Sequence, residues 1–504
     1  MILVPALEPG KASAQYWGGY AADPQHTCLS KVASQVPQQV LWHMPVDLNP
    51  PFSGGNLFIH YASPVITRKN TVIVTVRGTP NNPNAFQFKA VKGQNGAGAW
   101  SQALTTDYIT PPHSWYPICG PTLVSGGQSL AVPGAGGTVY LRTNPDRVTG
   151  AITQRCFYSS VADYNANKLS FNSSVFICTP ITADDDGNLY FGFAILAPAA
   201  GAPAKGGLAR ISKAGVGTYV TAAAATGDAT MQKVVYNGAP ALSQDGTTVY
   251  VGVNDKVNGN SGFGTGFLVA LDSQTLATKG KIRLKDVKSP GNNALLPDDG
   301  SGTPTVGPDG DVYFGVLENN LGSNNYRGWL LHFSGDLATA KTPSAFGWDI
   351  TPSIVPASAV ASYDGSSSYL VLTKYNNYAG AGGDGQNRMA ILDPNDSEID
   401  PVRGAMSMKV VISVLGPTPD PEYGGNAVRE WCVNSTAVDP FNKCAVVNSE
   451  DGNVYRWNFT TNTLTPALTL AAATGEAYTP TVIGPDGAVY AINRAVLNCC
   501  VKLP

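Results

Sequence analysis

The sequence predicts an all-β fold, a single eight-bladed β-propeller, from its composition, a recurring phrase and the number of copies of that phrase. Gly (55) and Pro (37) are abundant in the 504 residues, and charged residues make up 13% of the chain, well below the roughly 25% usual for globular domains. No long stretch has the apolar spacing of an amphipathic helix. This composition is typical of proteins built from many short strands joined by tight turns.

The phrase consists of a small residue and Pro, a short apolar strand, a polar turn that often contains Asp-Gly, and a second strand that often begins with Val-Tyr. Asp-Gly supplies the positive φ angles of a two-residue hairpin turn. Proline at the first residue of a strand removes no ladder hydrogen bond. Copies of the phrase begin at Ser63, Gly120, Thr179, Ala239, Thr303, Thr351 and Thr479, with a copy that lacks proline at Ser435.

Each copy is expected to provide the inner strands of one blade. Eight copies leave more chain per blade than four strands need, so we expect inserted loops, most clearly at 375–385 and 416–425. Seven blades are the alternative, because the boundary between two blades is not well defined in the long stretch between the copies at Thr351 and Ser435. In blade 1, strands are predicted at 63–67, 71–77, 86–91 and 100–104.

The last blade has too little chain for four strands after residues 489–493. Residues 40–43 are predicted to supply its outer strand, which would close the ring and remove the sheet edges. The expected domain organisation is a leader or signal remnant at 1–14 and one propeller at 15–504. Ala12-Ser13-Ala14 has the form of a signal-peptidase site, although no basic segment precedes it. Low Lys and Glu usage favours a secreted or periplasmic protein.

The net charge of −3 and the scattered Lys and Arg residues give no electrostatic footprint for nucleic acid. No apolar run reaches the roughly 18 residues of a transmembrane helix. We therefore expect a monomer whose partner is a protein, a glycan or a small molecule.

The eight cysteines include no CxxC pair, so a structural zinc site is not expected. Cys432 and Cys444 flank a turn at 439–442, and this spacing predicts a disulfide across two neighbouring strands. Buried free thiols are the alternative.

Several residues resemble the tryptophan-docking motif A-x-D-x-x-T-G-x-x-x-W of the quinoprotein-like (pyrroloquinoline quinone repeat) family. Ala90, Gly96 and Trp100 have its spacing, with Lys92 in place of Asp and Asn95 in place of Thr. A second, partial copy and an N-terminal segment similar to the family's opening segment support the resemblance; they comprise Ala270, Asp272 and Thr275, and residues 16–27.

The resemblance implies two kinds of function. Some members of the family are dehydrogenases that hold pyrroloquinoline quinone and Ca²⁺ at the channel mouth, and others are non-catalytic and bind proteins. The dehydrogenases have a vicinal disulfide early in the chain, whereas Cys499-Cys500 lies near the end of this one. Because the docking motifs are incomplete, a binding or scaffold module is the first hypothesis and a quinone-dependent oxidoreductase the alternative.

The loops that lead into the inner strands of a propeller gather around its channel mouth. Residues just before each copy are therefore predicted to form a ligand site. They are His60, His113, Trp115, Tyr116, Asp349, Arg429, Glu430, Trp431, Glu476 and Tyr478.

Within this set, Glu430 and Glu476 precede neighbouring inner strands and are candidates for Ca²⁺ ligands or an acid/base pair. Solvated rim glutamates are the alternative. His60 and His113 are candidate metal ligands or bases, and hydrogen-bonded loop histidines are the alternative. Tryptophans such as Trp431 are expected either to stack on a ligand or to pack between blades. A hydrolase or lyase that uses these rim groups is a further functional hypothesis.

Overall fold

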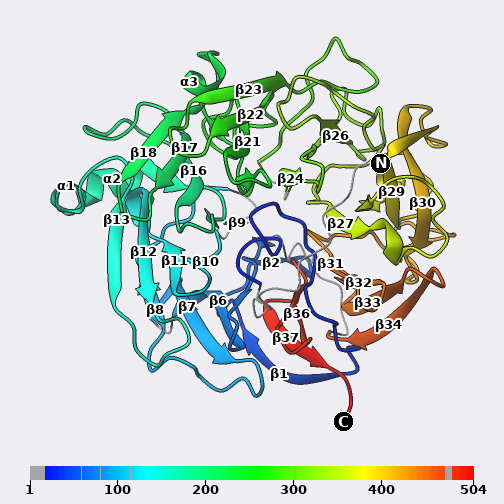
Figure 1. Ribbon diagram of the computed structural model, residues 1–504, viewed down its shortest axis with the longest axis horizontal. Coiled ribbons are helices and arrows are strands. Elements are labelled where there is room, and N and C mark those ends of the chain that lie inside the picture. The colour runs from blue at the N-terminus through cyan, green and yellow to red at the C-terminus, as the bar shows by residue number, and fades with distance from the viewer. Residues whose placement is uncertain are drawn as a thin grey trace.

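The computed structural model describes residues 17–57, 59–79, 81–113, 119–298, 300, 302–471 and 480–504, together with the backbone of 116–117. These residues form a ring of eight sheets around a central axis, and the chain runs once around the ring from blue to red (Figure 1). The predicted all-β, eight-bladed propeller is confirmed. No helix within the described residues is long and apolar enough to cross a membrane.

The first four blades follow one another in chain order from the inner strand outwards. In blade 3 the two inner strands β14 and β15 both pair with β16, and in blade 4 β19 and β20 both pair with β21. Their strands are β5 (Val65–Ile66), β6 (Thr71–Thr79), β7 (Asn82–Lys92) and β8 (Leu104–Thr106); β10 (Thr122–Val124), β11 (Ser129–Pro133), β12 (Thr138–Thr143) and β13 (Ile152–Cys156); β14 (Val175–Ile177), β15 (Thr182–Ala183), β16 (Leu189–Ile195), β17 (Gly207–Ile211) and β18 (Gly217–Thr221); β19 (Lys233–Val234), β20 (Ala241–Leu242), β21 (Thr248–Asn254), β22 (Gly266–Asp272) and β23 (Thr278–Arg283).

Blades 5 to 8 complete the ring. Blade 5 has three strands, and isolated bridges at Ala340 and Ser344 continue its outer edge. The strands are β24 (Thr305–Val306), β25 (Val312–Val316) and β26 (Trp329–Phe333); β27 (Ser353–Pro356), β28 (Tyr369–Tyr375), β29 (Arg388–Ile399) and β30 (Met406–Leu415); β31 (Ala437–Asp439), β32 (Cys444–Asn448), β33 (Asn453–Asn458) and β34 (Thr463–Thr469); β35 (Val482–Ile483), β36 (Val489–Asn493), β37 (Val496–Val501) and β1 (Gln39–Pro45).

Smaller elements decorate this ring. The remaining pairs are β2 (Phe52–Ser53) with β3 (Asn56–Leu57) and β4 (Ile59–His60) with β9 (Tyr116–Pro117), and the helices are α1 (Val161–Ala166), α2 (Lys168–Ser174) and α3 (Ala222–Thr226), with 3-10 turns at Ala135–Gly137, Ala357–Ala359 and Ala379–Ala381.

Each copy of the sequence phrase stands directly before an inner strand, as predicted. Pro180 precedes β15 and Pro304 precedes β24, whereas the copy without proline precedes β31. The Asp-Gly turns have the expected left-handed glycines, with φ angles of 95° at Gly187 and 88° at Gly310. The predicted two-residue turn is wrong, because Asp186 and Asp309 do not have positive φ and five residues separate the flanking pairs Ala183–Leu189 and Val306–Val312. Local turn chemistry therefore sets where each blade begins.

The long step between the copies at Thr351 and Ser435 contains an enlarged blade 6 and no additional blade. Its outer strands β29 and β30 form an extended hairpin, and Met408 of this hairpin donates a backbone hydrogen bond to Pro343 of blade 5 at 2.7 Å. The hairpin therefore packs on the neighbouring blade, which accounts for the extra chain.

The ring closes as the sequence predicts. Strand β1 pairs antiparallel with β37, from Gln39 opposite Val501 to Pro45 opposite Val496. The outer strand of blade 1 differs from its prediction, because it begins at Leu104 and Trp100 lies before it. The Trp100 indole donates to the Pro145 carbonyl at 2.7 Å and lies under the Arg142 guanidinium, so this residue docks onto blade 2.

The N-terminal segment 17–35 crosses the middle of the ring, where Figure 1 draws it in dark blue. Its backbone carbonyls accept hydrogen bonds from inner-strand N–H groups that would otherwise line the channel unpaired. The six donors, at 2.7–2.9 Å, are Ile66, Leu123, Leu242, Val306, Ile354 and Val438, one from each of blades 1, 2, 4, 5, 6 and 7. Part of the channel is thus filled by the chain itself.

Candidate functional site

The predicted residues of blades 6 and 7 come together at one end of the channel. Asp349 lies in the loop before β27, and Glu430 lies in the loop before β31. Lys374, near the end of β28, forms an ion pair with Asp349 at 3.6 Å, and both side chains are buried. The Lys374 charge also acts on Glu430, which shows that the loops of the two blades converge.

A second glutamate, Glu450, stands beside Glu430 and comes from the turn between β32 and β33. The Cys432 thiol lies between them, 4.0 Å from the Glu430 Oε2 atom and hydrogen-bonded to Glu450. Arg429 Nη1 is 3.8 Å from Glu450 Oε1. Nothing in the sequence spacing singled out Glu450 or Lys374, because both reach the mouth only through the tertiary fold.

Burial raises the pKa of Glu430 to about 8, and the neighbouring negative charge of Glu450 adds to the effect. Burial likewise raises the pKa of Glu450 to about 7, against the opposing effects of the Cys432 hydrogen bond and Arg429. Asp420 raises both pKa values further. Both carboxyl groups therefore titrate near neutral pH.

The other predicted residues are distributed differently. His60 lies in β4 and is buried, and His113 is buried with its ring 5.9 Å from that of Tyr236, beside blade 4. Trp431 is 1% exposed and its ring packs against Tyr455 at 5.6 Å, which is the blade-packing arrangement. Trp115, Glu476 and Tyr478 lie outside the described residues, as does the side chain of Tyr116.

The predicted disulfide between Cys432 and Cys444 is wrong, since both are buried free thiols. The tight hairpin places Cys444 opposite Asp439, at the turn end of β31 and β32. Cys432 lies before the other end of β31, at the channel mouth. The Cys444 sulfur instead accepts a hydrogen bond from Arg456 Nε at 3.2 Å.

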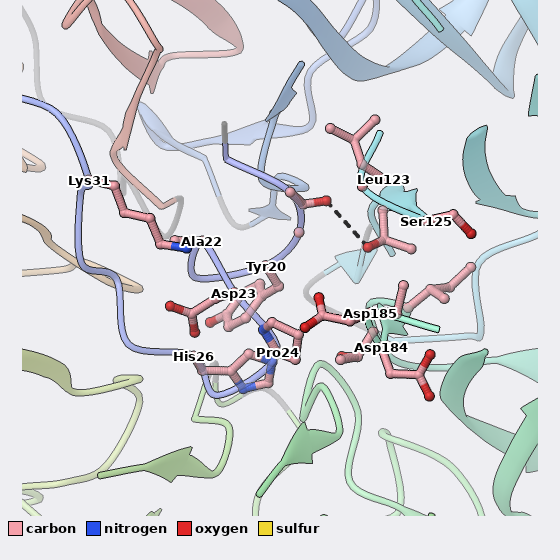
Figure 2. A pocket seen from close by; sticks show the side chains of 17 residues that line it. Tyr20, Ala22, Asp23, Pro24, His26, Lys31, Leu123, Ser125, Asp184 and Asp185 are labelled. Atoms are coloured by element: carbon pink, nitrogen blue, oxygen red, sulfur yellow. Dashed lines mark hydrogen bonds between the residues drawn. The ribbon is translucent and has the colours of Figure 1, made fainter. Parts of the chain in front are cut away.

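Apart from the channel mouth, a hollow of about 100 Å³ lies between the N-terminal segment and the inner strands of blades 2 and 3. Figure 2 shows Asp23 and Lys31 on one side of it and Asp184 and Asp185 on the other. The Asp184 carboxylate accepts hydrogen bonds from the Asn188 backbone and side chain, both at 2.7 Å. It therefore stabilises the hairpin turn, and the hollow has room for a few waters only.

Comparison with known proteins gives the fold. No family model and no curated protein matches the sequence. The chain is similar to a europium-containing methanol dehydrogenase, at 10% identity and TM-score 0.56 over 95% of this chain and 89% of that one. It is similar to quinohemoprotein alcohol dehydrogenase from Comamonas testosteroni, at 10% identity and TM-score 0.57 over 98% and 82%. Saccharomyces cerevisiae Sqt1 matches at 11% identity and TM-score 0.52 over 94% and 100%. At these identities the likenesses bear on the fold alone, and they agree with the β-propeller architecture described above.

The described residues do not fit the quinone and Ca²⁺ that the resemblance implies. Cys499 and Cys500 are buried free thiols in the middle of β37, between β36 and β1, where they cannot cover a planar group at the channel mouth. Within the described part of the chain, no group of three His, Cys, Asp or Glu residues is placed to hold a metal ion. At the mouth, Asp349 is already paired with Lys374.

Proposed function

We propose that the protein is a quinoprotein-like propeller that works as a binding module, and that its channel mouth over blades 6 and 7 binds a basic segment of a partner protein. The observation that carries this proposal is the Glu430–Glu450 pair. Both carboxyl groups are only partly buried, burial raises the pKa of each, and the negative charge of Glu450 raises the pKa of Glu430 further.

The charges around the pair favour a cationic ligand. Lys374 is already paired with Asp349, and Arg429 lies against Glu450. Asp420 and Glu422 add further negative charge near Glu430. An incoming Lys or Arg side chain would supply the missing positive charge, so binding would lower both pKa values and release protons. A neutral glycan would gain nothing from this electrostatic imbalance.

A second candidate function rests on the same pKa values. A carboxylic acid whose pKa lies near neutrality is suited to general acid/base catalysis, so the pair would also suit a hydrolase or lyase. Export to the periplasm or the cell exterior is part of the proposal, on the support of the low Lys and Glu usage.

Isothermal titration calorimetry with a synthetic oligolysine peptide and an uncharged glutamine peptide of equal length tests the binding role. We expect the lysine peptide alone to bind, more tightly at pH 8 than at pH 6, with protons released to the buffer. Glu430→Gln and Glu450→Gln should each weaken binding about tenfold, whereas Asp336→Asn on blade 5 should not. Equal binding of both peptides, or no effect of the two glutamine variants, would refute the proposal. Hydrolysis in a substrate screen that Glu430→Gln abolishes would favour the second function.

A further inference from the structure

A cavity of about 650 Å³ lies at the rim of the ring, outside the channel mouth. It is bounded by the loop between β25 and β26, the loop between β28 and β29, and the β29–β30 hairpin that Figure 1 shows at the edge of the ring. The loop between β28 and β29 corresponds to the Asn- and Gly-rich insert that the sequence marks at 375–385. The volume falls within the roughly 300–1,000 Å³ of small-molecule sites.

The floor of the cavity is built from buried polar groups. Arg327 is fully buried and donates two hydrogen bonds to the Asp400 carboxylate, at 2.9 and 3.1 Å. Its guanidinium lies 4.8 Å from the centre of the Tyr375 ring. Asn325 donates to Asn377 at 2.8 Å and accepts from Arg403. These contacts hold the lining rigid and join blade 5 to blade 6.

The acidic groups of the lining already have donors. Asp384 accepts from Asn377 Nδ2 at 2.7 Å and from the Gln386 backbone at 2.9 Å. Glu398 accepts from the Val410 backbone at 3.0 Å. The carboxylates at the cavity are therefore engaged by the protein itself.

Two arginines of the lining have N–H groups that make no hydrogen bond within the described part of the chain. Among the described residues, the Arg388 guanidinium at the start of β29 lines the cavity without a hydrogen bond or ion pair. The buried Nε atom of Arg327 is also without a partner in the described part of the chain. The cavity thus has a surplus of donors, and an arginine fork with free N–H groups matches the two oxygens of a carboxylate.

We infer that this rim cavity is a second ligand site, which takes a small organic carboxylate. Arg388 binds the carboxylate group. Tyr375, Pro401, Val402 and Val410 contact the remainder of the ligand. The lining of the rim cavity does not include Glu430 or Glu450. The cavity favours a negatively charged ligand, whereas the channel mouth favours a positively charged one, so the two proposed sites are separate.

Ligand-observed NMR and calorimetry with two matched pairs test the inference: phenylacetate against phenylacetamide, and glucuronate against glucose. At least one of the acids should bind at millimolar concentration, and its neutral counterpart should not. Arg388→Gln should weaken that binding about tenfold or more, and Arg388→Lys, which keeps the charge but not the fork, should weaken it less.

Two controls locate the effect. Arg155→Gln, on the outer strand of blade 2, and Glu430→Gln, at the channel mouth, should leave the affinity for the acid unchanged. Near-ultraviolet circular dichroism of Arg388→Gln should match that of the unmodified protein. The inference is overturned if neither acid binds, if the acid and its neutral counterpart bind equally, or if Arg388→Gln has no effect.

Discussion

The Trp42 indole donates a hydrogen bond to the Gly93 carbonyl at 2.7 Å. Trp42 lies in β1, the outer strand of blade 8, and Gly93 follows β7 of blade 1. The same indole ring packs so close to Gly96 that a Cβ atom at that position would lie 2.8 Å from it, and Gly96 has a φ of 69°. The contact with Trp42 therefore joins the last blade to the first. Any other residue at Gly96 would be strained, because of the positive φ and the close indole ring.

Trp42→Ala should destabilise the propeller, because it removes this hydrogen bond and opens a gap at the closure of the ring. We expect a loss of about 2–4 kcal/mol in the free energy of unfolding, measured by urea denaturation. Leu41→Ala, at the neighbouring residue whose side chain is 46% exposed, should cost far less. Equal losses for the two variants would show that Trp42 does not fasten the ring.

Tyr20 anchors the N-terminal segment inside the channel. Its buried hydroxyl contacts Thr351 Oγ1 at 2.8 Å and donates to the Asn434 side chain. Tyr20→Phe leaves these buried groups with one partner fewer, so stability should fall by about 1–2 kcal/mol, seen as a lower midpoint of thermal unfolding. Tyr219→Phe, at a tyrosine that is 43% exposed, is the matched control and should change the midpoint little.

The sequence predicts the blades well because the signals that start them are local. Proline before β15, or a left-handed glycine at Gly187, acts through its own backbone angles. The channel filling is different, since the N-terminal segment bonds to the inner strands through backbone carbonyls, which any sequence possesses. No side-chain pattern could therefore reveal it.

The candidate site was predicted only in part for a similar reason. Glu430 stands before an inner strand, where the architecture alone brings it to the mouth. Glu450 follows β32 and Lys374 lies near the end of β28. These strands run antiparallel to the inner strands β31 and β27, so each residue returns to the end of the blade at which the inner strand begins. The distance along the chain carries no information about these contacts.

All eight cysteines are buried free thiols, and alkylation should reveal this. The folded protein, treated with iodoacetamide without reductant, should gain no adduct by mass spectrometry, because no thiol is accessible. In denaturant, still without reductant, it should gain one adduct on every cysteine. Two fewer adducts, restored by a reducing agent, would demonstrate a disulfide and contradict the structure, in which all eight thiols are free.

Stability should fall as the pH rises from 5 to 8.5, and Glu430 should be a principal cause. Burial raises its pKa from 4.5 to about 8, so the folded state keeps a proton that the unfolded state has lost over this range. The stabilisation that this proton contributes is fully present below the pKa of Glu430 in the unfolded state. It is lost as the pH rises to the pKa of Glu430 in the folded state. Glu430→Gln stays neutral at every pH and should be more stable than the unmodified protein at pH 8.5, by about 1–3 kcal/mol. The two should be nearly equal at pH 5.

Urea denaturation at several pH values measures this slope. Asp245→Asn is the control, because hydrogen bonds from Ser243 and Thr247 lower the pKa of Asp245 to about 2, and the residue therefore stays ionised throughout the range. That variant should keep the slope of the unmodified protein. If Glu430→Gln instead loses stability at pH 8.5, the carboxylate is ionised and well paired in the folded state, and the imbalance of charge that favours a basic ligand at the channel mouth does not exist.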